Sequence, residues 1–359
     1  SLGAGLDFEA SSSMLRETQD GPTTDGSPAA NAIRPAGKHY DYRVEGRTAG
    51  TYATLEFAPT ARWSVGAALR LERTRYAYDN RMIAGNTDEN GVPCGASSCL
   101  YHRPADRTDE FDNVAPKLEL MFAPRTQQRV YANWSRGFRP PEQTELYRLQ
   151  RQQDSADLDS EELQGAELGW RGDYRRYEWS LAAYALEKRH VIVRDSSGFN
   201  VNGGRTTHRG FEYEFGWRPA VEWRAVVAGS LAWHRYDFSA AVEGGETIRR
   251  GNDIDTAPRN VHALRIGWTP TPAIDAELEV LDVGRYWLDA ANLHEYAGHT
   301  LLNLRASWTP APAWRLSLRA INLADTAYAD RADYAFGNYR YFPGRGRAAF
   351  VEVAYRHDR

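Results

Sequence analysis

The segment 308–323 reads WTPAPAWRLSLRAINL. From position 314 to position 320 an apolar side chain stands at every second residue, and arginine or serine stands between. A period of two is typical of a β-strand that has one apolar and one polar face. The proline-containing turn before this strand has a tryptophan on each side, Trp308 and Trp314. The segment therefore predicts a strand whose apolar face starts at a tryptophan-lined turn.

The same arrangement recurs along the chain, in turns that read APTARW (58–63), WRGDYRRYEW (170–179), WRPAVEW (217–223) and WTPTPAI (268–274). Tryptophan prefers a membrane–water interface because its ring is apolar and its N–H is polar. A row of short turns bordered by tryptophan is expected at one mouth of a membrane β-barrel. The tryptophans beside these turns are Trp63, Trp170, Trp179, Trp217, Trp223, Trp268, Trp308 and Trp314.

The alternating pattern predicts fourteen strands, separated by connections that are alternately short and long. Short turns on the periplasmic side and long loops on the extracellular side are typical of outer-membrane barrels. In the run 223–233 the apolar face spans ten residue steps, roughly 33 Å at about 3.3 Å per residue. Tilting lowers this to about the height of a barrel's apolar band. The predicted strands are 2–14, 41–58, 62–80, 110–123, 128–137, 162–172, 177–194, 205–218, 222–238, 259–269, 273–287, 296–309, 313–325 and 346–356.

Composition is compatible with this fold. The chain has 359 residues, of which 42% are hydrophobic and 26% are charged. No stretch approaches the roughly 18 apolar residues of a spanning helix. A β-barrel needs none, because only every second residue of a strand meets lipid. The formal charge of −4 argues against nucleic acid as a partner. No secretion signal stands at the N-terminus. We therefore expect an all-β, transmembrane antiparallel barrel.

Two cysteines, Cys94 and Cys99, lie close together in VPCGASSCLY. The short spacing and the intervening glycine allow a small disulfide loop, which an oxidising compartment favours. Two unpaired loop thiols are the alternative. A metal site is not expected, because the chain has no second cysteine pair.

Several phrases resemble TonB-dependent outer-membrane receptors. The segment 131–147, YANWSRGFRPPEQTELY, is similar to the family's GFRxPxxxELY phrase. Further similar phrases are GGRTTHRGFEYEFGW (203–217), TAPRNVHALRIGW (256–268) and PGRGRAAFVEVAYR (343–356), in the family's order. One departure is that the chain continues past Tyr355, where family members usually end on an aromatic residue. The residues that match the first phrase are Gly137, Phe138, Arg139, Pro140, Glu145, Leu146 and Tyr147.

The resemblance implies a barrel of about 22 strands with a plug inside. Fourteen strands would make residues 1–359 a single C-terminal barrel portion, without the plug, the TonB-contacting segment and the first strands. It also implies a Gram-negative outer-membrane receptor that takes up a scarce nutrient, such as a ferric siderophore or another iron complex. Its partners would be that ligand, outer-membrane lipid and the TonB–ExbB–ExbD energising complex, reached through the missing N-terminal region. No cofactor is expected.

Ligand contacts should come from the long loops, because these form the extracellular mouth. Two loops, 286–296 and 326–345, are rich in aromatic and arginine residues. Guanidinium forks suit carboxylate or catecholate groups, and aromatic rings add stacking area. Interfacial and loop-packing roles are the alternative for each of these residues. The candidate ligand residues are Tyr286, Trp287, His294, Tyr296, Tyr328, Arg331, Tyr334, Tyr339 and Arg340.

Three other protein classes compete with a receptor. A complete fourteen-stranded passive channel or porin would have the same even strand count. A soluble all-β protein would hide its apolar face in a core, and would not usually place tryptophan at both ends of it. An outer-membrane enzyme would need a catalytic constellation, but the histidines are scattered and no nucleophile elbow or zinc-spaced cluster appears. We therefore expect no enzyme activity.

Overall fold

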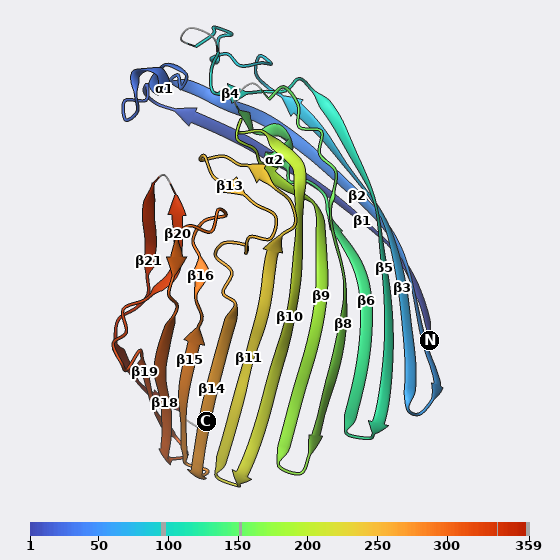
Figure 1. Ribbon diagram of the computed structural model, residues 1–359, viewed down its shortest axis with the longest axis vertical. Coiled ribbons are helices and arrows are strands. Elements are labelled where there is room, and N and C mark those ends of the chain that lie inside the picture. Colours follow the sequence, from blue (N-terminus) through green and yellow to red (C-terminus); the bar gives the residue numbers. More distant parts are fainter. Residues whose placement is uncertain (95–97, 151–152, 336, 357–359) are drawn as a thin grey trace.

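One antiparallel sheet of fourteen strands dominates the computed structural model, which describes residues 1–94, 98–150, 153–335 and 337–356. The strands are neighbours in the sheet in the same order as in the sequence. Figure 1 shows the sheet as a tall curved wall with short turns at one end and long connections at the other. The strands are β1 (Leu2–Gln19), β2 (Gly37–Thr60), β3 (Trp63–Asn80), β5 (Arg107–Arg125), β6 (Gln128–Arg139), β8 (Glu161–Tyr174), β9 (Tyr177–Arg194), β10 (Asn200–Ala220), β11 (Trp223–Tyr236), β14 (Asn260–Thr271), β15 (Ile274–Val283), β18 (His299–Ala311), β19 (Trp314–Ile321) and β22 (Ala348–Tyr355).

The predicted strands and the alternation of short and long connections are confirmed. At the turn end, Thr60 pairs with Trp63 and Ala311 pairs with Trp314, so only two residues close each turn. The tryptophans border these turns as expected, and the rings of Trp223 and Trp268 lie 5.9 Å apart on neighbouring strands. The start of β1 and the end of β22 lie toward this end of the wall, where Leu2 pairs with Leu55 and Tyr355 pairs with Trp314 (Figure 1).

Several strands extend further toward the loops than the sequence pattern predicts. β1 continues to Gln19 rather than residue 14, and β10 begins at Asn200 rather than residue 205. The apolar alternation marks only the apolar band, whereas backbone pairing continues beyond it, where both faces are polar. In the other direction, β15 ends at Val283 and β19 at Ile321, each four residues before the predicted boundary.

The two faces of the sheet differ as the alternation predicts. On β11, Trp223, Leu231 and Trp233 are 44%, 38% and 41% exposed. Val226 and Ala232, on the opposite face of the same strand, are buried. We call the first the apolar face and the second the polar face. A soluble sandwich would cover the apolar face, and here it is open along the wall.

The polar face carries charges that pair across neighbouring strands. Arg70 on β3 reaches Asp7, two strands away, at 2.6 Å. Arg265 and Glu279, which are directly opposite each other on β14 and β15, pair at 3.0 Å. Because opposite charges on facing positions stabilise a sheet, these pairs support the wall without an apolar core behind it.

The long connections contain short elements that the sequence pattern did not reveal. Four small two-stranded sheets are β4 (Tyr101–His102) with β7 (Leu149–Gln150), β12 (Ala240–Ala241) with β13 (Thr247–Ile248), β16 (Tyr286–Trp287) with β17 (Glu295–Tyr296), and β20 (Ala329–Ala335) with β21 (Asn338–Pro343). The two helices of the described residues are α1 (Pro28–Ala32) and α2 (Gln143–Tyr147). No helix in the described part of the chain is long and apolar enough to cross a membrane.

The connections gather into two groups at the loop end. The N-terminal loop cluster comprises the described residues of 20–36, 81–106 and 140–160. The C-terminal loop cluster comprises those of 237–259, 284–298 and 322–347. The sheet itself is open, since its order runs from β1 at one edge to β22 at the other, and the described residues show no pairing between these two strands.

Candidate functional site

The C-terminal loop cluster brings together all nine candidate ligand residues. Backbone hydrogen bonds join its three segments. Thr256 N–H donates to the Trp287 carbonyl at 2.8 Å, and Tyr334 N–H donates to the Leu288 carbonyl at 2.9 Å. The Ala290 N–H donates to the Glu246 carboxylate at 3.0 Å. The middle segment is therefore held between the other two.

Two of the candidate tyrosines hold the β20 backbone in place. The hydroxyl of Tyr286 accepts a hydrogen bond from the Ala332 N–H, and that of Tyr296 accepts one from the Ala329 N–H, both at 3.1 Å. Their rings lie 5.1 Å apart, and Tyr286 is 8% exposed. Burial raises the pKa of the Tyr286 hydroxyl. Both side chains thus have a packing role in this structure.

His294 is fixed from two directions. Its ring stacks on Tyr334 with centroids 3.5 Å apart, and its Nδ1 lies 3.0 Å from the carboxylate of the buried Asp289. The edge of Tyr339 closes a third side at 5.3 Å. Tyr328 packs separately, against His299 at 4.7 Å.

The outer surface of the same cluster keeps charge and aromatic area exposed. Arg331 and Arg340 both reach the buried Asp333, at 3.1 and 2.5 Å, yet their side chains are 64% and 45% exposed. Tyr339 and Tyr341 stack along β21 with nearly parallel rings 6.3 Å apart. Each is a little over half exposed. Guanidinium edges and ring faces are therefore both available here.

The same loop cluster also lines a cavity of about 190 Å³. Its wall includes Ala232 and His234, which lie on the polar face of β11, together with the candidates Tyr286 and Trp287. Two ion pairs also line it, Arg259 with Asp253 at 2.6 Å and Arg285 with Glu295 at 3.2 Å. A cavity that combines aromatic walls with fixed charges is suited to a small polar ligand.

Sequence reasoning identified only two of the residues that line the cavity. His234, Asp253, Arg259, Arg285 and Glu295 come from three segments far apart in the chain. No sequence motif or regular spacing links these residues. Their proximity depends on how the loops fold over the wall.

The motif that gave the strongest resemblance forms a structural corner of the N-terminal loop cluster. Arg139, at the end of β6, bonds Glu161 at 2.7 Å and meets Glu145 with two hydrogen bonds of 3.1 Å. Helix α2 then places Leu146 and Tyr147 in a buried core, and the Tyr147 hydroxyl donates to Asp109 at 2.7 Å. Arg139 and Glu145 therefore pair with each other, and Arg139 also pairs with the wall residue Glu161. The other motif residues, Gly137, Phe138 and Pro140, lie on or directly after β6.

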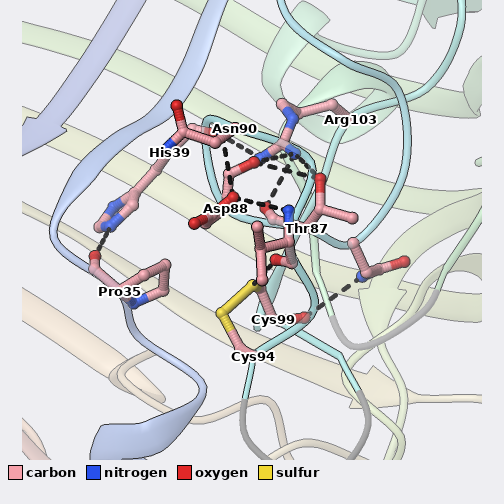
Figure 2. Close-up of a disulfide and its surroundings, with 10 residues drawn as sticks. Pro35, His39, Thr87, Asp88, Asn90, Cys94, Cys99 and Arg103 are labelled. Atoms are coloured by element: carbon pink, nitrogen blue, oxygen red, sulfur yellow. Dashed lines mark hydrogen bonds between the residues drawn. A yellow bond between two sulfur atoms is a disulfide. The ribbon is translucent and has the colours of Figure 1, made fainter.

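Cys94 and Cys99 are joined by a disulfide in this structure. Figure 2 shows the bond beside the buried Arg103, whose guanidinium reaches the carbonyls around it. Arg103 donates to the Ile83 and Thr87 carbonyls at 2.8 Å each. It is 1% exposed, and burial lowers the pKa of its guanidinium. The segment 83–88, near the disulfide, is thus folded around one buried cation.

The described residues contain no group of three or more histidines, cysteines and acidic residues that could hold a metal ion. His208 and His234 do lie together on the polar face, with their Nδ1 atoms 2.9 Å apart, but no third ligand joins them.

A known protein family matches most of the chain. A sequence model of the family described as "TonB dependent receptor-like, beta-barrel" matches residues 1–323. No curated protein matches the chain.

Solved structures match the fold at low sequence identity. The siderophore receptor PiuA from Acinetobacter baumannii is 16% identical with a TM-score of 0.69, and the match covers 89% of this chain and 44% of that one. The ferric yersiniabactin uptake receptor FyuA from Yersinia pestis is 17% identical with a TM-score of 0.73, over 99% and 51% of the two chains. The ferric-catecholate import receptor Fiu from E. coli is 15% identical with a TM-score of 0.74, over 98% and 51%. The chain thus spans about half the length of these structures.

Proposed function

The chain belongs to the TonB-dependent receptor-like β-barrel family, and we propose that it acts within a Gram-negative outer-membrane receptor that imports a scarce nutrient. The ligand we favour is a ferric siderophore or another iron complex. The observation that carries the proposal is the C-terminal loop cluster, which contains both a charged and aromatic cavity and a surface of exposed rings, at one end of a membrane-type wall. The names of the similar solved structures, which are iron-complex receptors, support the ligand class.

Within that cluster we assign ligand contact to the exposed residues first. Tyr339 offers a ring face, and Arg331 and Arg340 offer guanidinium edges held in position by Asp333. Planar guanidinium forks bind carboxylate and catecholate oxygens with two parallel hydrogen bonds. The cavity beside Trp287 then takes the part of the ligand that reaches furthest inward. Tyr286, Tyr296, His294 and Tyr334 support this surface from beneath.

We also propose that this chain is one portion of a larger barrel with a plug. The sheet is open at β1 and β22, and an open wall would leave its charged face in contact with lipid. The chain also covers about half of each similar structure. Energy for release of the ligand would come from the TonB–ExbB–ExbD complex acting on the plug. The family is one of receptors and transporters, and we assign no catalytic step to this chain.

Uptake by whole cells that carry the full-length receptor tests the transport step. Radiolabelled iron complexes with catecholate, hydroxamate or carboxylate chelators should accumulate only in cells with a working TonB protein. Equal accumulation without TonB would identify a passive channel instead.

Binding to the purified receptor tests the site. Tyr339→Ala should weaken the complex that wild type binds best by about tenfold, because an exposed ring that stacks on a ligand contributes about 1 kcal/mol or more. Tyr355→Ala, at the turn end of β22, is the matched control and should leave affinity unchanged. If Tyr339→Ala bound every iron complex as tightly as wild type, the exposed surface of the C-terminal loop cluster would not be the binding site.

A further inference from the structure

A second feature with binding chemistry lies outside the loop clusters, on the apolar face of the wall. At the loop end of β10 and β11 is an open groove of about 620 Å³. Its lining includes Arg209, Arg235, Arg250, Trp233 and Asp237. The ligand site proposed above does not use any of these residues.

The register of the two strands places this groove at the upper border of the apolar band. Arg209 is directly opposite Trp233, and two residues nearer the turns Phe211 is opposite Leu231. Paired residues of antiparallel strands share a face, so Arg209 lies on the same face as these apolar side chains. Trp233, Phe211 and Leu231 are each about 40% exposed. Tryptophan at this level marks the boundary between hydrocarbon and headgroups.

The groove carries excess positive charge. Three arginines and one aspartate line it. Asp237 is bonded to Arg250 at 2.6 Å and also lies 3.9 Å from Arg205, so one carboxylate is shared by two cations. Among the described residues, Arg235 makes one long pair, 3.5 Å from Asp253. Arg209 is exposed, and the described residues provide it with no ion pair or side-chain hydrogen bond.

Arg209 thus presents unshared N–H donors at the border of an apolar band, where they are accessible to an external anion. We propose that this groove binds the phosphorylated headgroup of a lipid in the leaflet next to the loops. Arginine binds phosphate through two parallel N–H donors, and clusters of basic side chains beside a membrane recognise anionic headgroups. The acyl chains would lie along Trp233, Leu231 and Phe211. The groove volume is within the range of sites that bind small ligands. The proposal rests on the membrane location and not on the identity of the transported nutrient.

The test uses the full receptor in detergent and measures its affinity for three probes. These are a diphosphorylated glucosamine-based lipid, the same lipid after enzymatic dephosphorylation, and inorganic phosphate. Wild type should bind the phosphorylated lipid at least tenfold more tightly than the dephosphorylated one. The triple variant Arg209→Gln, Arg235→Gln, Arg250→Gln should lose this preference, and raised salt should weaken it in wild type.

The matched control removes the same charge at the turn end, with Arg62→Gln, Arg125→Gln and Arg218→Gln, and should retain the preference. Arg209→Gln alone should reduce the preference about threefold, and it disturbs no internal ion pair, so it serves if the triple variant does not fold. Binding of iron complexes should be the same in all variants, which separates this proposal from the transport proposal. A preference that survives in the triple variant would overturn the lipid site. Inorganic phosphate that binds as tightly as the lipid would also overturn it, in favour of a small-anion site.

Discussion

The two loop clusters stand at the same end of the same wall, but they are built differently. In the described structure, a core of twelve buried residues, most of them aromatic or leucine, joins the N-terminal cluster to β2, β3 and β5, and a disulfide and the buried Arg103 add to it. The C-terminal cluster has a core of four, Tyr286, Leu288, Ala329 and Ala332. Its polar groups supply much of its cohesion. The first cluster is therefore expected to be a rigid frame, and the second an adaptable contact surface.

The arginines of the two clusters differ in the same way. In the N-terminal cluster, Arg103 donates its N–H groups to surrounding carbonyls and is buried. Arg331 and Arg340 are anchored by Asp333 and still present most or nearly half of their side-chain surface to solvent. An anchored, exposed guanidinium is pre-organised for an outside partner, because less side-chain freedom is lost on binding. Arginine therefore stabilises the fold in the N-terminal cluster, whereas in the C-terminal cluster it is available to bind a ligand.

Loss of Arg103 should have the largest effect, and it should be confined to the N-terminal cluster. Arg103→Met removes the donors from several buried carbonyls, and each unsatisfied group costs about 1–3 kcal/mol, so opening of the N-terminal cluster should become easier by about 3–5 kcal/mol. Hydrogen exchange of the amides in 81–106 measures this. The control Arg331→Met, in the C-terminal cluster, should change its own loop by about 0.5 kcal/mol or less, as exposed substitutions do. If hydrogen exchange rose by a similar factor in both variants, the two clusters would not differ in rigidity.

Reduction of the Cys94–Cys99 bond should loosen the same cluster by less. A cross-link that closes so short a loop contributes about 2 kcal/mol. Mass spectrometry of the unreduced protein should show the two residues linked, and reductant should speed exchange in the N-terminal cluster only. Alkylation of either thiol without reductant would contradict this expectation.

Two buried tyrosines provide a matched pair of hydroxyl deletions. Tyr147→Phe removes a hydrogen bond to the Asp109 carboxylate and should cost about 1.5 kcal/mol, because bonds to charged groups are the stronger ones. Tyr286→Phe removes the acceptor of one backbone N–H and should cost about 1 kcal/mol. Denaturant-dependent hydrogen exchange resolves each cluster. If Tyr286→Phe lowered stability more than Tyr147→Phe, the C-terminal cluster would be the more rigid of the two.

The smallest expected effect concerns pH. Burial, followed by the nearby Asp289 and Asp255 carboxylates, raises the pKa of Glu246. A raised folded pKa means that the folded state binds the proton more tightly, so the stability of the C-terminal cluster falls as pH rises from the ordinary glutamate range through the raised pKa. Glu246→Gln should remove this dependence and stabilise the cluster at neutral pH by about 0.5 kcal/mol or less. Hydrogen exchange of the 288–296 amides between pH 4 and 8, corrected for intrinsic rates, measures this stability. If wild type and Glu246→Gln showed parallel pH profiles, Glu246 would not be the cause of the pH dependence.

The wall could be predicted in nearly all its parts from the sequence. The alternation at 223–233 or 314–320 reflects a local geometric rule, since neighbouring residues of a strand point to opposite faces. Tryptophans and two-residue turns then mark one rim, and loop length marks the other. Strand ends were less certain, because pairing at residues such as Gln19 and Asn200 depends on a partner strand rather than on local apolarity.

The candidate site could be predicted only as a region. Loop composition indicated where aromatic and arginine side chains gather, and the structure brings the nine candidates together. It also divides them, because Tyr286 and Tyr296 hold a neighbouring backbone, whereas Tyr339, Arg331 and Arg340 face outward. The cavity residues Asp253, Arg259 and Glu295 carried no sequence signal, since no periodicity governs irregular loops.

By itself, the sequence determined the strand order, the facing of each strand, the two rims and the family resemblance, because each depends on residues that are neighbours along the chain. The tertiary structure alone decided which loops pack on which, that Arg103 is enclosed and Arg209 is not, and where a cavity forms. Those features depend on contacts between segments that are tens to more than a hundred residues apart. Such contacts form only after the sheet has placed the loop ends side by side.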